Sequence, residues 1–356
     1  MDDKQFSWTA ATLNDVEKGR IYDVDDCLFV PALYRPFCKQ NLCYYRPLNE
    51  RMYMIPSQFP KGTDENLVIC VPGLGSNKGF SCLISTIIPD LNIFGGGAQC
   101  FPLYYYEENK SLQGTLFDMD NEDKYIRRDG ITDWILQQFR SRFSGARSLT
   151  KEMIFYYVYG ILHSPDYRTR FADDLKKSLP RLPIVDTVED FMAFYKAGWE
   201  LAKLHLEYET VPPCEDCEVY VTNFVETEAY TAYDHFRVTK MKFGKENICV
   251  DLAAGAKRPS RTTVDDKSVI LVNENIRISN IPLEAYDYVV NGKSAIEWVM
   301  ERYAVTIDKK SLIKNDPNDW AREHNQPRYI LNLLLSVINL SVQTTRIVKN
   351  LPRLTF

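Results

Sequence analysis

Apolar and polar positions change their spacing several times along the chain, and each spacing predicts a different kind of element. Over residues 1–115, short apolar runs such as 66–71 and 100–106 alternate with prolines and glycines, a pattern typical of β-strands joined by turns. Over residues 130–206 the apolar positions lie three and four apart, which is the spacing of an amphipathic helix. Strand character returns over 215–280, and helical character returns from residue 294 and again over 328–349.

Residues with N-cap chemistry mark where these helices should begin. A short side-chain oxygen can accept a hydrogen bond from a free N–H group of the first helical turn. Such residues precede four predicted helices: Thr150, Ser164 with Pro165 at the first helical position, Thr187 with Asp190 three residues on, and Ser294 with Glu297 three residues on. One side of the helix after Thr187 carries Phe191, Phe194, Tyr195, Gly198, Leu201 and His205.

The second β-rich region contains four predicted strands, at 218–225, 236–243, 246–252 and 268–278. Gly244 and Lys245, between two of these strands, predict a two-residue hairpin turn. The alternation of β-rich and helical segments predicts an α+β fold, with mixed sheets and helical subdomains interleaved. We expect a β-rich subdomain over 1–120, a helical one over 121–210, a β-rich basic one over 211–285 and a C-terminal helical segment over 286–356.

The composition is that of a globular protein, with 45% hydrophobic and 26% charged residues. Because the net charge is −5, any binding to nucleic acid must depend on a local basic face rather than on the overall charge. Nine cysteines and no signal-peptide pattern predict reduced thiols. No apolar run approaches the ~20 residues of a membrane span, so we expect a cytoplasmic protein that does not enter a membrane.

Two motifs come close to catalytic signatures and miss them. The loop over 73–79 (GLGSNKG) has neither the third glycine of a dinucleotide-binding loop nor the Gly-Lys-Ser/Thr of a nucleoside-triphosphate loop. The Pro-Pro pair at 212–213 has no Asp or Asn before it and no aromatic residue after it, and a methyltransferase acting on an exocyclic amine needs both. The chain has no complete catalytic motif, and we expect no cofactor in it, no ATP hydrolysis and no methyl transfer.

A nuclease pattern and a cysteine pair leave two alternatives open. Pro89-Asp90, followed by Glu108 and Lys110, matches the arrangement in which two carboxylates hold Mg²⁺ and a lysine helps to activate water. Such short patterns also arise by chance. Cys214 and Cys217 have the spacing of one half of a zinc site, but no second pair follows at a similar spacing, so a reduced turn and a metal site both remain possible.

Basic residues gather in three stretches, around 35–51, 124–151 and 237–267. Any single cluster of this kind is ordinarily a solvated face. Three clusters in an acidic chain indicate segregated charge, which DNA binding uses.

An ordered series of motifs resembles the C-terminal specificity region of type ISP restriction-modification enzymes. The motifs are residues 34–37 (YRPF), 48–51 (LNER), 73–81 (GLGSNKGFS), 88–91 (IPDL), 99–106 (QCFPLYYY), 129–134 (DGITDW), 155–167 (FYYVYGILHSPDY), 174–183, 201–209, 290–298 (VNGKSAIEW) and 315–320 (NDPNDW). The resemblance covers nearly the whole chain. Those enzymes join a nuclease, an ATPase motor that translocates on DNA, a helical coupler, an adenine-N6 methyltransferase and a target-recognition domain in one polypeptide.

The resemblance implies sequence-specific binding to double-stranded DNA as part of a larger enzyme. Because only the last part is matched, it implies an excised fragment, a split gene product or a degenerate locus, with the methyltransferase and ATPase–nuclease parts in the same polypeptide or in a separate chain. It also weakens the nuclease alternative, since the family's nuclease lies at the far N-terminal end.

Two groups of residues follow as candidate DNA contacts. We expect contacts to phosphates from Arg35, Lys78, Arg127, Arg128, Arg140 and Arg142. We expect base readout from the variable stretch 215–275, by Arg237, Lys240, Lys257, Arg258 and Arg261, because a β-hairpin can enter the major groove. Three functions stay open: target recognition, a self-contained Mg²⁺ nuclease, and a scaffold whose basic clusters bind an acidic protein partner.

Overall fold

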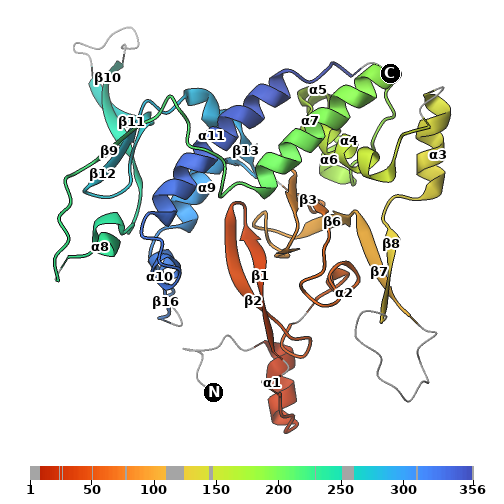
Figure 1. Ribbon diagram of the computed structural model, residues 1–356, viewed down its shortest axis with the longest axis horizontal. Helices are drawn as coiled ribbons and strands as arrows, with labels where there is room; N and C mark the ends of the chain where they lie inside the picture. The colour runs from red at the N-terminus through yellow and green to blue at the C-terminus, as the bar shows by residue number, and fades with distance from the viewer. Residues whose placement is uncertain are drawn as a thin grey trace. The chain divides into compact units, whose positions relative to one another are not determined.

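A computed structural model of the chain describes residues 9–23, 25, 27–49, 51–76, 78–109, 124–143, 147–228, 230–250, 260–309 and 312–354, with the side chains of 248–250 and 260–261 outside the description. The chain divides into two compact units. Unit 1 consists of Tyr208–Val289 and Lys293–Thr345, and unit 2 of Phe6–Glu207, Val290–Gly292 and Arg346–Phe356. Each unit combines helices with small sheets, which confirms the predicted α+β class (Figure 1).

Unit 2 contains the N-terminal strands and the helices predicted over 130–206. In chain order its elements are α1 (Ala10–Glu17), β1 (Leu28–Arg35), β2 (Cys38–Tyr44), α2 (Ile55–Gln58), β3 (Val68–Pro72), β4 (Leu83–Ser85), β5 (Ile88–Pro89), β6 (Ala98–Pro102), β7 (Tyr104–Glu108), β8 (Tyr125–Asp129), α3 (Asp133–Arg142), α4 (Lys151–His163), α5 (Pro165–Arg170), α6 (Asp174–Lys177) and α7 (Val188–Leu206). The strand order is β2-β1-β5 in one sheet and β4-β3-β6 in a second, and β7 pairs with β8.

The apolar run predicted as one strand over 100–106 is divided at Leu103. On one side β6 pairs antiparallel with β3, and on the other β7 pairs antiparallel with β8. Leu103 itself is buried; its N–H donates to the Leu67 carbonyl at 2.7 Å and its carbonyl accepts from the Gly130 N–H at 2.7 Å. The chain therefore changes sheets at a buried residue whose backbone groups are both satisfied.

Helices α4 and α7 pack against each other at the centre of unit 2. The Tyr157 ring stacks on Phe191 with ring centroids 5.0 Å apart, and both side chains are buried. The predicted N-caps are confirmed, since Thr150 Oγ1 accepts from the Met153 N–H at 3.2 Å and Thr187 Oγ1 accepts from the Asp190 N–H at 3.0 Å. The predicted apolar side of α7 faces the core.

Unit 1 contains the second β-rich region and the C-terminal helices. Its elements are β9 (Glu218–Val221), α8 (Ala232–Phe236), β10 (Lys242–Val250), β11 (Ser260–Leu271), β12 (Ile276–Ser279), the 3-10 helix η2 (Leu283–Asp287), β13 (Val289–Val290), β14 (Lys293–Ser294), α9 (Ala295–Arg302), β15 (Thr306–Ile307), β16 (Lys314–Asn315), α10 (Pro317–Glu323) and α11 (Tyr329–Lys349). Four strands form one sheet in the order β10-β11-β12-β9, and the remaining strands pair in twos. Val290 of β13 and the end of α11 from Arg346 on belong to unit 2.

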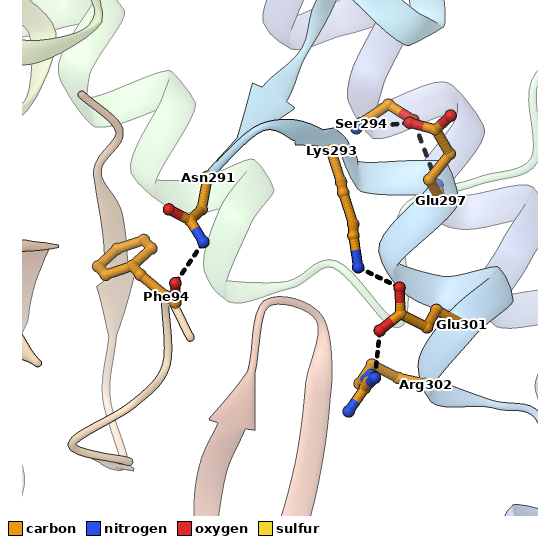
Figure 2. A network of polar contacts seen from close by, with 7 residues as sticks. All are labelled: Phe94, Asn291, Lys293, Ser294, Glu297, Glu301 and Arg302. Atoms are coloured by element: carbon orange, nitrogen blue, oxygen red, sulfur yellow. Dashed lines mark hydrogen bonds and ion pairs between the residues drawn. The ribbon is translucent and has the colours of Figure 1, made fainter. Parts of the chain in front are cut away.

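Helix α9 begins at the capping box that the sequence predicts. The Glu297 carboxylate accepts from the Ser294 backbone N–H at 2.9 Å, and Ser294 Oγ accepts from the Glu297 N–H at 3.2 Å (Figure 2). Figure 2 also shows Lys293 paired with Glu301, whose carboxylate accepts a second bond from Arg302. These contacts fix the first two turns of α9 at both the backbone and the side-chain level.

The predictions around residues 236–245 are wrong. Phe236 ends the short helix α8, and residues 237–241 form no strand. Gly244 and Lys245 lie inside β10 and make no turn. Gly244 is needed for another reason: a Cβ at this position would lie 2.9 Å from Cβ of Val269, where β11 bulges toward β10.

Helix α11 covers Tyr329–Lys349, which confirms the helix predicted over 328–349. By length and composition it satisfies the test for a membrane-spanning helix, and 72% of that window is buried within the fold. Burial of this extent is typical of a core helix, which needs no lipid to cover its apolar side chains.

Candidate nucleic-acid interface

Strands β10 and β11 continue as a two-stranded ribbon beyond the four-stranded sheet. Their pairing starts at Lys242 with Leu271, is interrupted after Phe243, and resumes from Gly244 with Asp266 to Val250 with Ser260. Strand β12 pairs with β11 only at Ile270 and Leu271, so no third strand supports this later part. We call residues 244–250 and 260–266 the β10–β11 ribbon (Figure 1).

The base of the ribbon is anchored by the bulge in β11. The Tyr286 hydroxyl donates to the Lys267 carbonyl at 2.7 Å, and the Ile281 N–H donates to the Ser268 carbonyl at 3.1 Å. The Lys267 ammonium lies 5.0 Å from the centre of the Tyr286 ring and 3.2 Å from Glu297. The bulge is thus held to the body of unit 1, and the ribbon extends from a fixed point.

Polar contacts join the two strands of the ribbon where no core supports them. Lys245 forms an ion pair with Asp265, and the Thr263 hydroxyl donates to Asn247 Oδ1 at 2.9 Å. All four side chains are exposed. Cross-strand pairs of this kind add roughly 0.2–1 kcal/mol each. They stiffen a two-stranded element beside which β12 does not pair.

Arg237, one of the predicted base contacts, is part of an internal network in unit 1. Its guanidinium bonds to Asp316, which also accepts from Lys314 at 2.8 Å and from the Asn318 amide at 2.7 Å. The Asp316 side chain is 1% exposed and caps α10. Burial by itself would raise the pKa of Asp316, but these hydrogen bonds outweigh it and hold the pKa far below its usual value. Releasing Arg237 would leave this buried carboxylate with fewer partners.

The other predicted base contacts lie at different distances from the ribbon. Lys240 is exposed and precedes β10 by two residues. The backbone of Arg261 lies inside the ribbon, opposite Cys249. Lys257 and Arg258 lie outside the described residues. The structure therefore places Arg261 in the ribbon and Arg237 in the body of unit 1.

Four of the predicted phosphate contacts in unit 2 have partners within the fold. Arg35 bonds to Asp90 at 2.9 Å and lies over the Tyr34 ring at 4.0 Å. Arg128 bonds to Glu107 at 3.2 Å across the β7–β8 pair, and Arg142 pairs with Asp186. Arg140 donates to the Leu149 carbonyl at 2.8 Å, which fixes the segment before α4.

The two remaining candidates are more open. The Arg127 guanidinium lies over the Tyr104 ring at 4.4 Å, and the residue is exposed. Lys78 is exposed in the glycine-rich loop after β3, and its side chain approaches Gly292. Both residues present charge to solvent from unit 2.

The residues of the nuclease pattern have other contacts. Asp90 accepts from Arg35 and from the Asn92 N–H at 2.7 Å, and Glu108 ends β7 opposite Tyr125. Lys110 lies outside the described residues. Within the described part of the chain, no group of three or more His, Cys, Asp and Glu side chains could hold a metal ion.

Cys214 and Cys217 form a turn in which the Cys217 N–H donates to the Cys214 carbonyl at 3.2 Å. Both thiols are free, and Cys214 is buried. Burial, followed by the neighbouring Cys214, raises the pKa of Cys217 to about 12. A thiol held in this state is a weak nucleophile.

The chain matches a protein-family model, the type ISP C-terminal specificity domain, over residues 1–333. The chain belongs to this family. None of the curated proteins matches the specificity domain.

Several solved structures of longer chains, determined in complex with DNA or a DNA mimic, are similar to the specificity domain. The ATP-dependent type ISP restriction-modification enzyme LlaBIII bound to DNA is 34% identical, with a TM-score of 0.78 over 99% of the specificity domain and 20% of that chain. A nuclease-deletion mutant of the type ISP enzyme LlaGI in complex with a DNA substrate mimic is 33% identical, with a TM-score of 0.75 over 100% of the specificity domain and 28% of that chain. The DrdV chain in a DrdV–DNA complex is 30% identical, with a TM-score of 0.76 over 98% of the specificity domain and 30% of that chain. The specificity domain therefore spans less than a third of the length of each.

Sequence reasoning missed how the ribbon of the specificity domain is held together. Its cross-strand contacts join residues 16 to 20 positions apart, and the strand boundaries predicted for this region were wrong. The available signal was the run of three β-branched residues at 262–264 (Thr-Thr-Val), which favours a strand that begins before residue 268.

Proposed function

We propose that this specificity domain recognises a target sequence in double-stranded DNA on behalf of a type ISP restriction-modification enzyme. The observation that carries the proposal is the β10–β11 ribbon, which is anchored at its base and exposes the side chains of residues 245–247, 262, 263 and 265. A major groove about 12 Å wide admits a two-stranded ribbon, so such an element can reach base edges. The similar structures, solved in complex with DNA or a DNA substrate mimic, support the same conclusion.

In this proposal, residues of unit 1 read the bases. The glycine-rich loop and the basic residues of unit 2 contact phosphates. We keep Lys257, Arg258 and Arg261 as base contacts because an arginine fork can donate two hydrogen bonds to guanine. Lys240 remains a proposed base contact, and Arg237 remains one only if it leaves Asp316. The phosphate candidates keep their assignment. Arg128 and Arg142 are in exposed ion pairs, which contribute ~1 kcal/mol or less and can be exchanged for phosphate.

The rest of the enzyme is also part of the proposal. The methyltransferase and ATPase–nuclease parts would act from the same polypeptide or from a separate chain, in the cytoplasm. Binding by the specificity domain itself would need no cofactor.

Selection from a library of randomised duplexes by the purified chain tests this function directly. We expect a short consensus sequence to be enriched, with or without EDTA, ATP or S-adenosylmethionine. Uniform retention of all sequences, or no retention, would overturn target recognition. Cleavage of the library only when Mg²⁺ is present would instead support the nuclease alternative.

Single substitutions then test the base contacts. Against the selected duplex, Arg258→Ala and Arg261→Ala should each cost ~1–3 kcal/mol, while binding to a scrambled duplex stays nearly unchanged. Arg353→Ala, an exposed arginine of unit 2, is the matched control and should change neither. Equal losses on both duplexes would make these residues phosphate contacts.

A further inference from the structure

One row of exposed side chains crosses all four strands of the main sheet of unit 1. The strand register places Tyr220 of β9 beside Arg277 of β12, Arg277 beside Leu271 of β11, and Leu271 beside Lys242 of β10. Side chains in register on neighbouring strands point to the same face. We call these four residues the Arg277 row.

The row lies on the solvent face of the sheet. All four residues are exposed; Tyr220 retains 60% and Leu271 40% of its accessible surface. The alternate residues Ile270, Ile276 and Ile278 are buried on the other face. Only the face that carries these isoleucines therefore contributes to the core of the unit, and the Arg277 row does not.

The two cations of the row differ from most other charges of this unit. Arg237, Lys245, Lys267 and Lys293 each form an ion pair with a carboxylate. Within the part of the chain that the structure describes, neither Arg277 nor Lys242 has such a partner. In a protein with a net charge of −5, two cations without a carboxylate partner on one sheet face are available to an anionic ligand, although Glu274 lines the same hollow as Arg277.

Side-chain hydrogen bonds hold the hairpin between β11 and β12, the two strands that carry Leu271 and Arg277 of the row. Asn273 donates to the carbonyls of His235 and Arg237 at 2.9 and 3.0 Å, which ties the hairpin to α8. Asn275 donates to the Tyr230 hydroxyl at 3.1 Å. A fixed hairpin holds the neighbouring residues of the row in one position. This lowers the entropy cost of ordering the row when a ligand binds.

We propose that the Arg277 row contacts the phosphate backbone of duplex DNA. The inference rests on the proposed target recognition and adds to it a site on the sheet, distinct from the ribbon. Phosphate is favoured over base edges because the row lies on the face of the four-stranded sheet and not on the ribbon, and only a protruding element can enter a groove. Strands spaced about 4.8 Å apart put Arg277 and Lys242 about 10 Å from each other, so they would bind separate phosphates. The Tyr220 hydroxyl adds a neutral donor beside them.

The double variant Lys242→Gln/Arg277→Gln tests the proposal with the full chain and a short duplex of mixed sequence. Each lost phosphate contact lowers the slope of log K against log salt by ~0.9, so the double variant should lose ~1.8. The loss of affinity should be the same for the selected and the scrambled duplex. Lys242→Arg/Arg277→Lys, which keeps both charges, should restore the slope.

Lys309→Ala, an exposed lysine of the same unit between β15 and β16, is the control and should leave the slope unchanged. A wild-type slope in the double variant would overturn the phosphate assignment while target recognition stands, and would leave the row as the face for an acidic protein surface. A loss confined to the selected duplex would also overturn it, because base readout would then be the cause. If the wild-type chain binds no duplex, the proposed function and this inference fail together.

Discussion

Two glycines meet where helices α4 and α7 cross in unit 2. A Cβ on Gly198 would lie 1.9 Å from the Tyr156 carbonyl oxygen, and a Cβ on Gly160 would lie 2.2 Å from the Phe194 carbonyl oxygen. Both neighbours are backbone atoms, which cannot rotate away. The glycines thus set the distance between the two helices that carry the aromatic core.

We predict that Gly198→Ala destabilises the protein despite its better helix propensity. Propensity alone favours alanine by about 1 kcal/mol. Overpacking against backbone costs ~3 kcal/mol, so the net loss in unfolding free energy should be about 2 kcal/mol. Urea denaturation measures it. Gly96→Ala is the matched control, because a Cβ there would meet nothing within 4 Å; equal effects at the two positions would contradict the packing argument.

Two histidines, His163 and His205, are buried in the same core. The Tyr159 hydroxyl bonds to His205 Nδ1 at 2.6 Å, and His163 Nδ1 lies 2.9 Å from the Tyr159 carbonyl. Burial, followed by the nearby Arg168, lowers the pKa of His205 to about 3, and the same causes lower the pKa of His163 well below its usual value. Both imidazoles are therefore neutral in the folded protein.

Stability should fall with acidification because unfolding allows these histidines to take up protons. The folded pKa is below the unfolded value of about 6.5, so the contribution is complete above pH 6.5 and is lost as the pH falls towards 3. For each pH unit of acidification in this window, each histidine should lower the free energy of unfolding by ~1.4 kcal/mol. Urea titrations at several pH values measure the slope. His205→Gln should make it shallower by about one proton, whereas His324→Gln, at an exposed site, should not.

At the scale of elements, helix caps were the most reliable sequence signals. Thr150, Ser164, Thr187 and Ser294 all cap helices as predicted. A cap involves residues within three positions, so the sequence contains the whole interaction. The strand boundaries over 236–252 failed because β-strands depend on partners: Gly244 looked like a turn residue, and its actual role is to accommodate a bulge in the neighbouring strand.

Removing the cap of α7 should give a small and specific loss. Thr187→Ala deletes the oxygen that accepts from the Asp190 N–H and should lower the unfolding free energy by ~1 kcal/mol. Thr187→Ser keeps that oxygen and should stay within a few tenths of the wild type. Thermal and urea denaturation of both variants measure the difference. A full loss in the serine variant would mean that the threonine methyl group, rather than the cap, stabilises the helix.

At the scale of the whole molecule, contacts within the fold decide which basic side chains are available to a ligand. Most of the arginines singled out for phosphate binding bond to carboxylates or carbonyls of the fold. Arg127 and Arg128 of β8 are the pair in unit 2 whose contacts are easiest to exchange, since one lies over an aromatic ring and the other in an exposed ion pair. An exposed pair contributes little to stability, so both side chains can turn to phosphate at low cost.

If these two arginines contact phosphates, Arg127→Gln/Arg128→Gln should flatten the salt dependence of duplex binding by ~1.8 in log–log slope. All duplex sequences should lose affinity alike. Salt titrations with a selected and a scrambled duplex check both statements, with Lys196→Gln on α7 as a control that keeps the wild-type slope. A slope that does not change would remove β8 from the interface.

The sequence by itself determined the helices and their caps, the α+β class and the family, because each depends on residues close together or on motifs in a fixed order. Tertiary structure alone decided which basic residues remain available to a ligand. Arg237 is bound to Asp316, 79 residues away, and Arg277 is aligned with Lys242 by strand register. Ion pairs and register depend on which segments fold beside each other. A cluster of charges along the chain therefore does not indicate which charges face solvent without a partner.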